Sequence, residues 1–119
     1  MAAVVNRHSV NDHFINKEPL VKAIYDAIVK AAEQFGPVKQ EAKKTSIHLV
    51  RKTAFAGVAT RQSALILTVK SKSDSSSARV IRREQVSANR WHLEVRIDAP
   101  QQVDADLKQW LKAAYELAG

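Results

Sequence analysis

The sequence predicts an α+β domain of two layers, in which two helices cover one face of a five- or six-stranded, mainly antiparallel sheet. Apolar residues recur with a helical period near both ends of the chain and with a period of two between them. Each segment has a single apolar face, and such elements bury these faces by packing as layers. We expect residues 1–13 to form a flexible arm and residues 14–119 to form one domain.

The first element is a helix that starts near Pro19 and ends at Phe35. Proline suits the first helical turn because its missing N–H would have no intrahelical partner there. Gly36 favours the left-handed conformation that ends helices, and Pro37 prevents continuation. The apolar positions in between form one stripe, made of Leu20, Ile24, Ala27, Ile28, Ala31 and Phe35.

Six strands are expected after this stop, at residues 38–43, 45–51, 54–59, 63–70, 79–86 and 91–97. The last strand has the clearest alternation, with Trp91 and Ile97 at the two ends of its apolar face. Arg51 falls in phase with the apolar residues of its strand, which places it either at the rim of the sheet or in a pocket under a helix. The Ser-rich run 71–78 is typical of a mobile hairpin tip between two strands.

A second helix is expected after Pro100. Asp104 and Asp106 fall in its first turn, where carboxylates interact favourably with the helix dipole. Tyr115 lies one position off the apolar stripe, and two interpretations stay open: its hydroxyl caps a pocket between this helix and the sheet, or it is a boundary tyrosine. The stripe itself consists of Val103, Leu107, Trp110, Leu111, Ala114 and Ala118.

Composition narrows the class of protein. The chain has 119 residues and no cysteine, which excludes disulfides, thiolate catalysis and cysteine-ligated metals. It contains no run of about 18 apolar residues, the length that a membrane-spanning helix requires. The N-terminus lacks the basic and apolar regions of a signal peptide. We therefore expect a cytoplasmic protein of bacterial type that does not contact a membrane.

Positive charge is concentrated in the middle of the chain. Residues 39–96 hold 13 Lys and Arg against four Asp and Glu, whereas the flanks hold six against eight. Most of the middle is predicted sheet, so the basic excess is expected on the open face of that sheet. Such a surface favours an anionic partner, although it is also consistent with an ordinary solvated face.

Catalytic and metal-binding motifs are missing from the sequence. It has no phosphate-binding glycine loop, no nucleophile-elbow serine motif and no paired-histidine zinc motif. His8 and His13 lie in the arm. His48 and His92 fall on the open face, where a metal site would also need a third ligand such as Glu94. We expect exposed histidines, no metal and no cofactor.

Five segments carry a resemblance to a known family: GPV at 36–38, KKTSIHLVR at 43–51, FAGV at 55–58, RWHLEV at 90–95 and DADLKQWLKAAYEL at 104–117. In this order they resemble small bacterial domains of unknown function, over residues 14–118. Members of that family stand alone or lie C-terminal to nuclease-like domains, and some are labelled predicted transport proteins. The resemblance implies the helix–sheet–helix fold, supplies no established activity, and singles out Lys44, Arg51, Phe55, His92, Trp110 and Tyr115.

Together these observations favour a binding module over an enzyme. The candidate binding residues are Lys44, Arg51, His92, Arg96 and Tyr115. The partner is expected to be either nucleic acid or a small ligand with a phosphate or carboxylate group, because arginine and lysine match such groups. Two alternatives remain open: a small enzyme with a pocket around Lys44, Arg51, His92 and Tyr115, and a protein-interaction or homodimer module.

Overall fold

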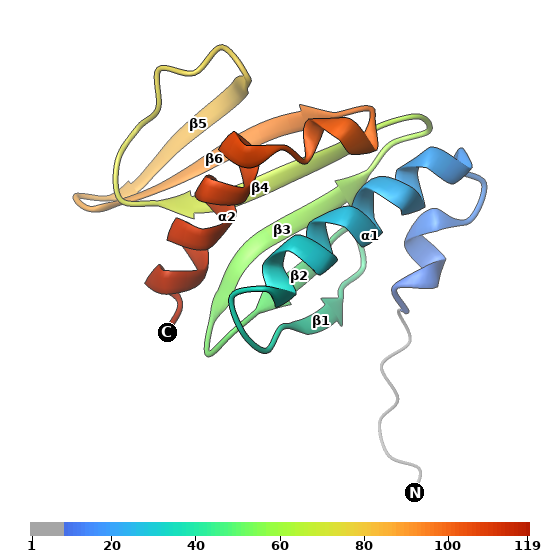
Figure 1. The fold of residues 1–119 in the computed structure, drawn as a ribbon, viewed down its shortest axis with the longest axis horizontal. Helices are drawn as coiled ribbons and strands as arrows, with labels where there is room; N and C mark the ends of the chain where they lie inside the picture. The colour runs from blue at the N-terminus through green and yellow to red at the C-terminus, as the bar shows by residue number, and fades with distance from the viewer. Residues whose placement is uncertain (1–8) are drawn as a thin grey trace, which may run out of the picture.

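A computed structural model describes residues 9–119, which form a helix–sheet–helix domain (Figure 1). Helix α1 spans Pro19–Glu33 and α2 spans Ala105–Leu117, with short 3-10 helices η1 (Asn11–Phe14) and η2 (Pro100–Gln102) before them. The strands are β1 (Lys39–Ala42), β2 (Ile47–Val50), β3 (Ala54–Thr60), β4 (Leu65–Ser71), β5 (Val80–Ser87) and β6 (Arg90–Ile97). They form one antiparallel sheet in the order β1-β2-β3-β4-β6-β5.

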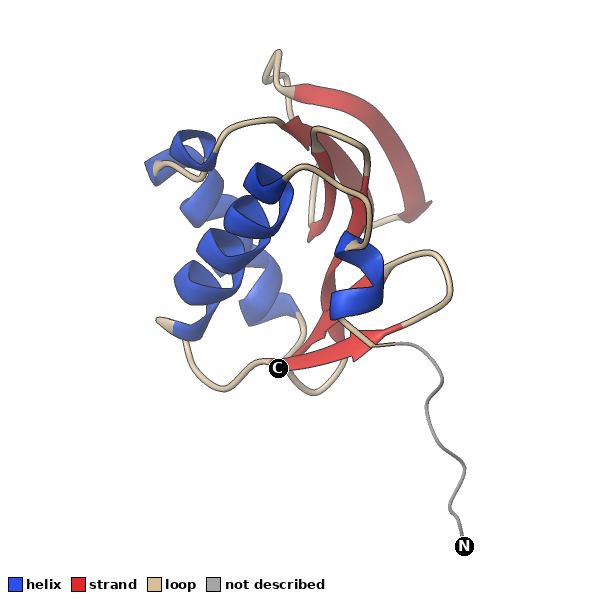
Figure 2. Ribbon diagram, turned by 90° about the vertical axis from the view of Figure 1, so that its right-hand side faces the viewer, coloured by secondary structure: helices blue, strands red, loops and turns tan. Residues whose placement is uncertain are grey.

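Both helices lie on the same side of the sheet, as Figure 2 shows, so the predicted fold class is confirmed. The sheet residues that face the helices are almost completely buried: Ile47, Leu49, Leu65, Leu67, Val69, Leu93, Val95 and Ile97. The opposite side is here called the open face. It is defined by the cross-strand row Glu41, His48, Gly57, Thr68, Glu94 and Arg82, with the residues at alternate positions along each strand as far as the register shifts.

The prediction that residues 71–78 form a hairpin tip is wrong, because β6 lies between β4 and β5. These residues form a longer connection that rises above the sheet (Figure 1). Of these two strands, β6 alternates apolar and polar residues and continues the buried layer beside β4. β5 has one buried residue and does not continue it. β5 is therefore an edge strand, and its register with β6 shifts at Ile81 and at Val86.

Tyr115 joins the end of α1 to α2. Its hydroxyl donates to the carbonyl of Pro37 at 2.9 Å, and its ring meets that of Phe55 edge-on with centroids 5.3 Å apart. Gly36 has a φ of 149°, and a Cβ at this position would collide with the Tyr115 hydroxyl. The predicted glycine stop is thus required by backbone conformation and by close approach. The expectation of a boundary tyrosine is wrong, since Tyr115 is only 3% exposed.

The predicted arm lies mostly outside the described residues, and its boundary at residue 14 stays a prediction. Its last part belongs to η1, whose His13 contacts the turn after β1 and the end of β3. The His13 Nε2–H donates to the carbonyl of Lys43 at 2.8 Å, and the Thr60 hydroxyl donates to the His13 carbonyl at 2.7 Å. His8 falls among the residues that the structure does not describe.

Helix α2 begins after Asp104, whose carboxylate accepts from the backbone N–H of Leu107 at 3.1 Å. Arg79 donates to both carboxylate oxygens, at 2.9 and 3.2 Å. The Leu107 hydrogen bond, followed by Arg79, lowers the pKa of Asp104 below its ordinary value of 3.8. The start of α2 and the connection before β5 are therefore held by one carboxylate.

We predict that Gly36→Ala destabilises the fold by about 1–2 kcal/mol, because the backbone angle strains an L residue and the new methyl group meets the Tyr115 hydroxyl. In a Tyr115→Phe background the hydroxyl is gone, so the same change should cost at least about 0.5 kcal/mol less. Chemical denaturation of the four proteins measures this coupling. Equal costs in both backgrounds would contradict the contact.

Asp104→Asn keeps a capping side chain but removes the charge. Folding lowers the pKa of Asp104, so its ionised carboxylate stabilises the folded protein at any pH above the pKa of the unfolded state. This stabilisation is lost as the pH falls through the pKa of the folded state. The advantage of wild type over Asp104→Asn in unfolding free energy should therefore shrink from about pH 6 to about pH 2. Urea titrations across this range test the prediction, and an advantage that is independent of pH would sink it.

Candidate functional site

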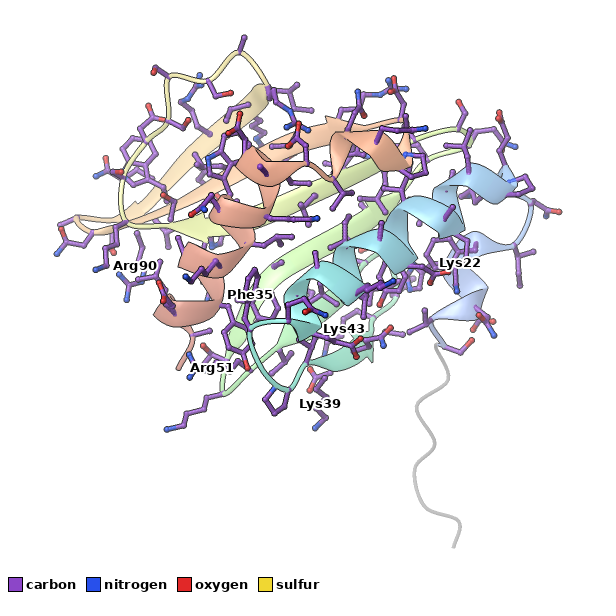
Figure 3. All side chains as sticks on the ribbon, in the orientation of Figure 1. Lys22, Phe35, Lys39, Lys43, Arg51 and Arg90 are labelled. Atoms are coloured by element: carbon purple, nitrogen blue, oxygen red, sulfur yellow. The ribbon has the colours of Figure 1, made fainter. Side chains whose placement is uncertain are left out.

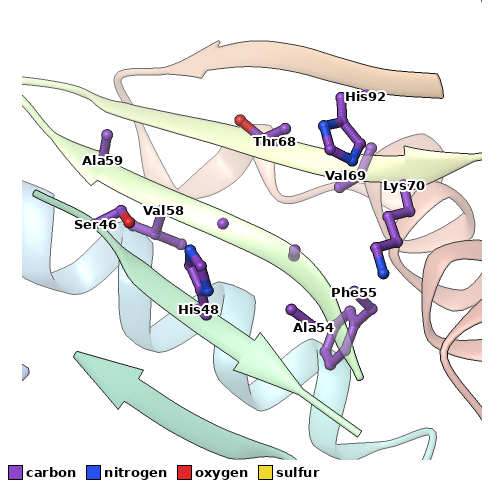
Figure 4. Close-up of a pocket in the computed structure, with 12 residues that line it drawn as sticks. Ser46, His48, Ala54, Phe55, Val58, Ala59, Thr68, Val69, Lys70 and His92 are labelled. Carbon is purple, nitrogen blue, oxygen red and sulfur yellow. The ribbon is translucent and has the colours of Figure 1, made fainter. Parts of the chain in front are cut away.

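A groove of about 280 Å³ crosses the open face above β3 (Figure 4). Its floor includes Gly57 and Ala59, whose small size leaves the strand backbone uncovered. The neighbouring strands supply the walls, because β2 and β4 flank β3 and carry side chains that stand above the sheet. The polar wall residues are Ser46 just before β2, His48 from β2, Thr68 and Lys70 from β4, and His92 from β6.

Positive charge meets this groove at one end. Lys70 and His92 are direct cross-strand partners, so their side chains start about 5 Å apart on the same face. Figure 4 shows the Lys70 amine on the side of the groove where β3 begins, near Ala54. Lys70 has no ion-pair partner among residues 9–119, whereas His92 Nδ1 lies 3.8 Å from Glu84 Oε1. One lysine charge is thus available to a ligand.

Arg51 and Tyr115 come together, but on the helix side of the sheet and away from this groove. The Arg51 guanidinium lies 4.5 Å from the Tyr115 ring centroid, and its Nη1–H donates to the Tyr115 carbonyl at 3.1 Å. The backbone N–H groups of Lys52 and Thr53 donate to the Ala118 carbonyl at 3.2 and 3.3 Å. Figure 3 shows Arg51 at this end of the sheet. The turn between β2 and β3 therefore caps α2, and Arg51 lies at the rim.

The other candidate residues lie elsewhere. Lys44 is exposed in the turn between β1 and β2, at the opposite end of β2 from Arg51. Arg96 is on the open face, and its Nη1 lies 3.4 Å from the Asp98 carboxylate. His92 and Tyr115 are separated by the sheet. The enzyme alternative requires one pocket shared by Lys44, Arg51, His92 and Tyr115. The structure does not bring these four residues together.

One expectation about the rest of the surface also differs from the structure. The basic excess is divided, because Arg79 binds Asp104 and Arg83 donates to Asp74 at 2.8 Å, both away from the open face.

The other tyrosine of the domain, Tyr25, is 1% exposed and donates to Gln40 Oε1 at 2.5 Å. Its burial, with the charge of Asp26, raises its pKa.

Metal binding gains no support from the described part of the chain. His48 and His92 are separated by two strands, β3 and β4. No group of three or more His, Asp or Glu within residues 9–119 is arranged to hold a metal ion. Over the same residues, no helix is both long enough and apolar enough to cross a membrane.

Sequence reasoning missed Lys70, Gly57 and Thr68 as site residues and weighed His48 only as a metal ligand. The signal for the floor is present in the sequence, since AGVA at 56–59 puts two small residues on the face that His48 shares. The walls were not predictable in the same way, because they depend on which strands flank β3.

These features define the class: a two-layer α+β domain with an uncovered sheet face and a groove across its central strands. A family described as a domain of unknown function, DUF5655, matches residues 10–118. The match covers most of the chain, so the chain belongs to this family, in agreement with the resemblance predicted from the sequence. Searches of curated proteins and of solved structures give no match.

Arg51→Ala is predicted to lower the unfolding free energy by about 1–2 kcal/mol, through loss of a hydrogen bond at the end of α2 and of the contact with the Tyr115 ring. Lys44→Ala removes the same charge from an exposed turn and should change stability by less than about 0.5 kcal/mol. Urea denaturation of both variants tests this difference. Equal stabilities would mean that Arg51 has no anchoring role.

Proposed function

We propose that this domain binds a small anionic ligand on the open face of its sheet, in the groove above β3. The observation that supports the proposal is Lys70, a lysine without an ion-pair partner among residues 9–119, which borders a groove that also contains His48 and His92. Imidazole and ammonium N–H groups form strong hydrogen bonds with phosphate and carboxylate. We also propose that the protein works in the cytoplasm, as its sequence suggests.

The dimensions of the site favour a small ligand over a nucleic acid. A volume of about 280 Å³ is near the lower end of the range of ligand pockets. Proteins that bind single strands stack bases on exposed aromatic rings, but within residues 9–119 Phe55, Tyr25 and Tyr115 are buried and Trp91 alternates with His92 toward the helix side. Glu41, Glu84 and Glu94 also interrupt the positive charge of the open face.

Lys70→Ala should weaken binding of a small anion by about tenfold, since loss of one charge-assisted hydrogen bond costs on the order of 1.5 kcal/mol. Lys72→Ala is the matched control, because it removes the same charge from an exposed residue outside the groove. Calorimetry or NMR titration with phosphate, acetate and larger anions at low salt provides the measurement. Equal effects of the two variants would contradict the proposed site.

A generic oligonucleotide belongs in the same panel. If it alone binds, with an affinity that falls steeply with salt, nucleic acid is the partner and the small-ligand proposal fails. If wild type sediments as a dimer, and Lys70→Ala or a larger side chain at Gly57 or Ala59 disrupts it, the open face is an interface between copies of the chain. If no anion shifts the protein signals, the proposed function is wrong.

A further inference from the structure

The glycine at the centre of the sheet is not explained by the chain's own packing. Gly57 is paired with His48 and with Thr68. The register shift between β2 and β3 begins at the next pair, where Phe55 is the extra residue of β3 opposite Leu49 and Val50. Its φ is outside the left-handed region, where Gly36 is found. A Cβ at Gly57 would meet only the Cδ2 of His48, at 4.0 Å, which is an ordinary contact. The fold therefore accepts a side chain here.

A glycine inside a strand has a cost that needs a reason. It destabilises a strand by about 0.5–1 kcal/mol relative to alanine, and it often marks a place where a ligand approaches the backbone. Here neither backbone angle nor crowding requires it, and the bulge of β3 is at Phe55, whereas Gly57 itself is regularly paired on both sides. The open space above Gly57 is thus the feature to be explained, and an occupant that lies against the backbone explains it.

The floor has the shape of a flat slot. Neighbouring strands lie about 4.8 Å apart, so the backbones of β2 and β4 are about 10 Å from each other across β3. Gly57 and Ala59 add little height between them. A planar ring fits this width when it lies parallel to the sheet, where peptide groups and one methyl group give dispersion contact with its face. The hydroxyls of Ser46 and Thr68 border its edges.

The charged end of the groove lies a short distance from this slot. Lys70 follows Thr68 by two residues on β4, and Thr68 is opposite Gly57, so the lysine begins about 7 Å along the strand from the centre of the floor. Glu84, the cross-strand partner of His92, and Glu94, the cross-strand partner of Thr68, lie on the same face. Their charge favours one compact anionic group over an extended polyanion.

From these observations we infer that the groove holds a molecule with a flat ring on Gly57 and a single carboxylate or phosphate group at Lys70 and His92. This inference rests on the proposed function and adds the class of ligand. An aromatic carboxylate and a nucleoside monophosphate share this chemistry. They differ in the anionic group and in ring size, which a binding panel separates.

The test uses matched pairs of ligands followed by NMR titration or calorimetry. Benzoate is compared with acetate, and a nucleoside monophosphate with inorganic phosphate, so that each pair differs by the ring. We expect the ring-bearing member of at least one pair to bind about tenfold tighter or more, and the better pair identifies the anionic group. Benzamide and an uncharged nucleoside should bind more weakly than their anionic counterparts, because they lack the group that Lys70 attracts.

Gly57→Leu supplies the matched variant, since its side chain fills the slot and a Cβ is tolerated there. It should bring the affinity ratio within each pair to about one, because the ring loses its place, and it should keep or raise the melting temperature. Ala59→Leu is the second floor variant, in case the first does not fold. Lys70→Ala should weaken both members of a pair.

The outcomes separate the two proposals. If ringless anions bind wild type as tightly as ring-bearing ones, or if both floor variants keep the preference for a ring, the inference on ligand class is wrong and anion binding stands. If no member of the panel binds, both proposals fall. If wild type is a dimer that Gly57→Leu dissociates, the slot holds a second copy of the chain and the inference is overturned.

Discussion

The fold depends on the contacts that the buried Tyr115 side chain makes between the two helices and the sheet. This side chain reaches the Pro37 carbonyl after α1, packs on Phe55 of β3, and lies under the Arg51 guanidinium. Segments distant in sequence therefore meet at one buried phenol ring. A buried hydroxyl without a partner would be costly, so the hydrogen bond to Pro37 also fixes where the chain turns from α1 into β1. Only glycine at position 36 lets the backbone come this close to the Tyr115 hydroxyl, because any Cβ there would collide with it.

The open face is left without such a structural role. Because both helices pack on the other side, the side chains that stabilise the domain are largely on the helix side of the sheet. The residues above β3 are then under weaker constraint from folding, so polar side chains are accepted there. This division explains why the candidate site is shallow and open while the layer beneath it is tightly packed.

Much of the fold was predictable because it depends on local pattern. The period of apolar residues located both helices and all six strands, and Gly36 and Pro37 located the end of α1. Strand order was not predictable in this way, since the run 71–78 resembles a hairpin tip whether or not β6 lies between its strands. The groove was not predictable for the same reason, because Lys70 lies beside His92 only when β4 pairs with β6. Arg51 was placed in conflict with its strand because a register shift after Leu49 lies outside simple alternation.

The register shifts at the two ends of β5 affect how copies of the domain behave in concentrated solution. An edge strand with free N–H and C=O groups is a template for runaway strand addition. Here the regular pairing of β5 with β6 is confined to Arg82–Gln85. Ile81 and Val86 are the extra residues of the two bulges, and their exposed fractions are 57% and 55%. Bulges twist an edge and interrupt its row of hydrogen-bonding groups. The sheet therefore ends at β5 with only a short regular edge on which another strand can pair, despite its exposed apolar residues.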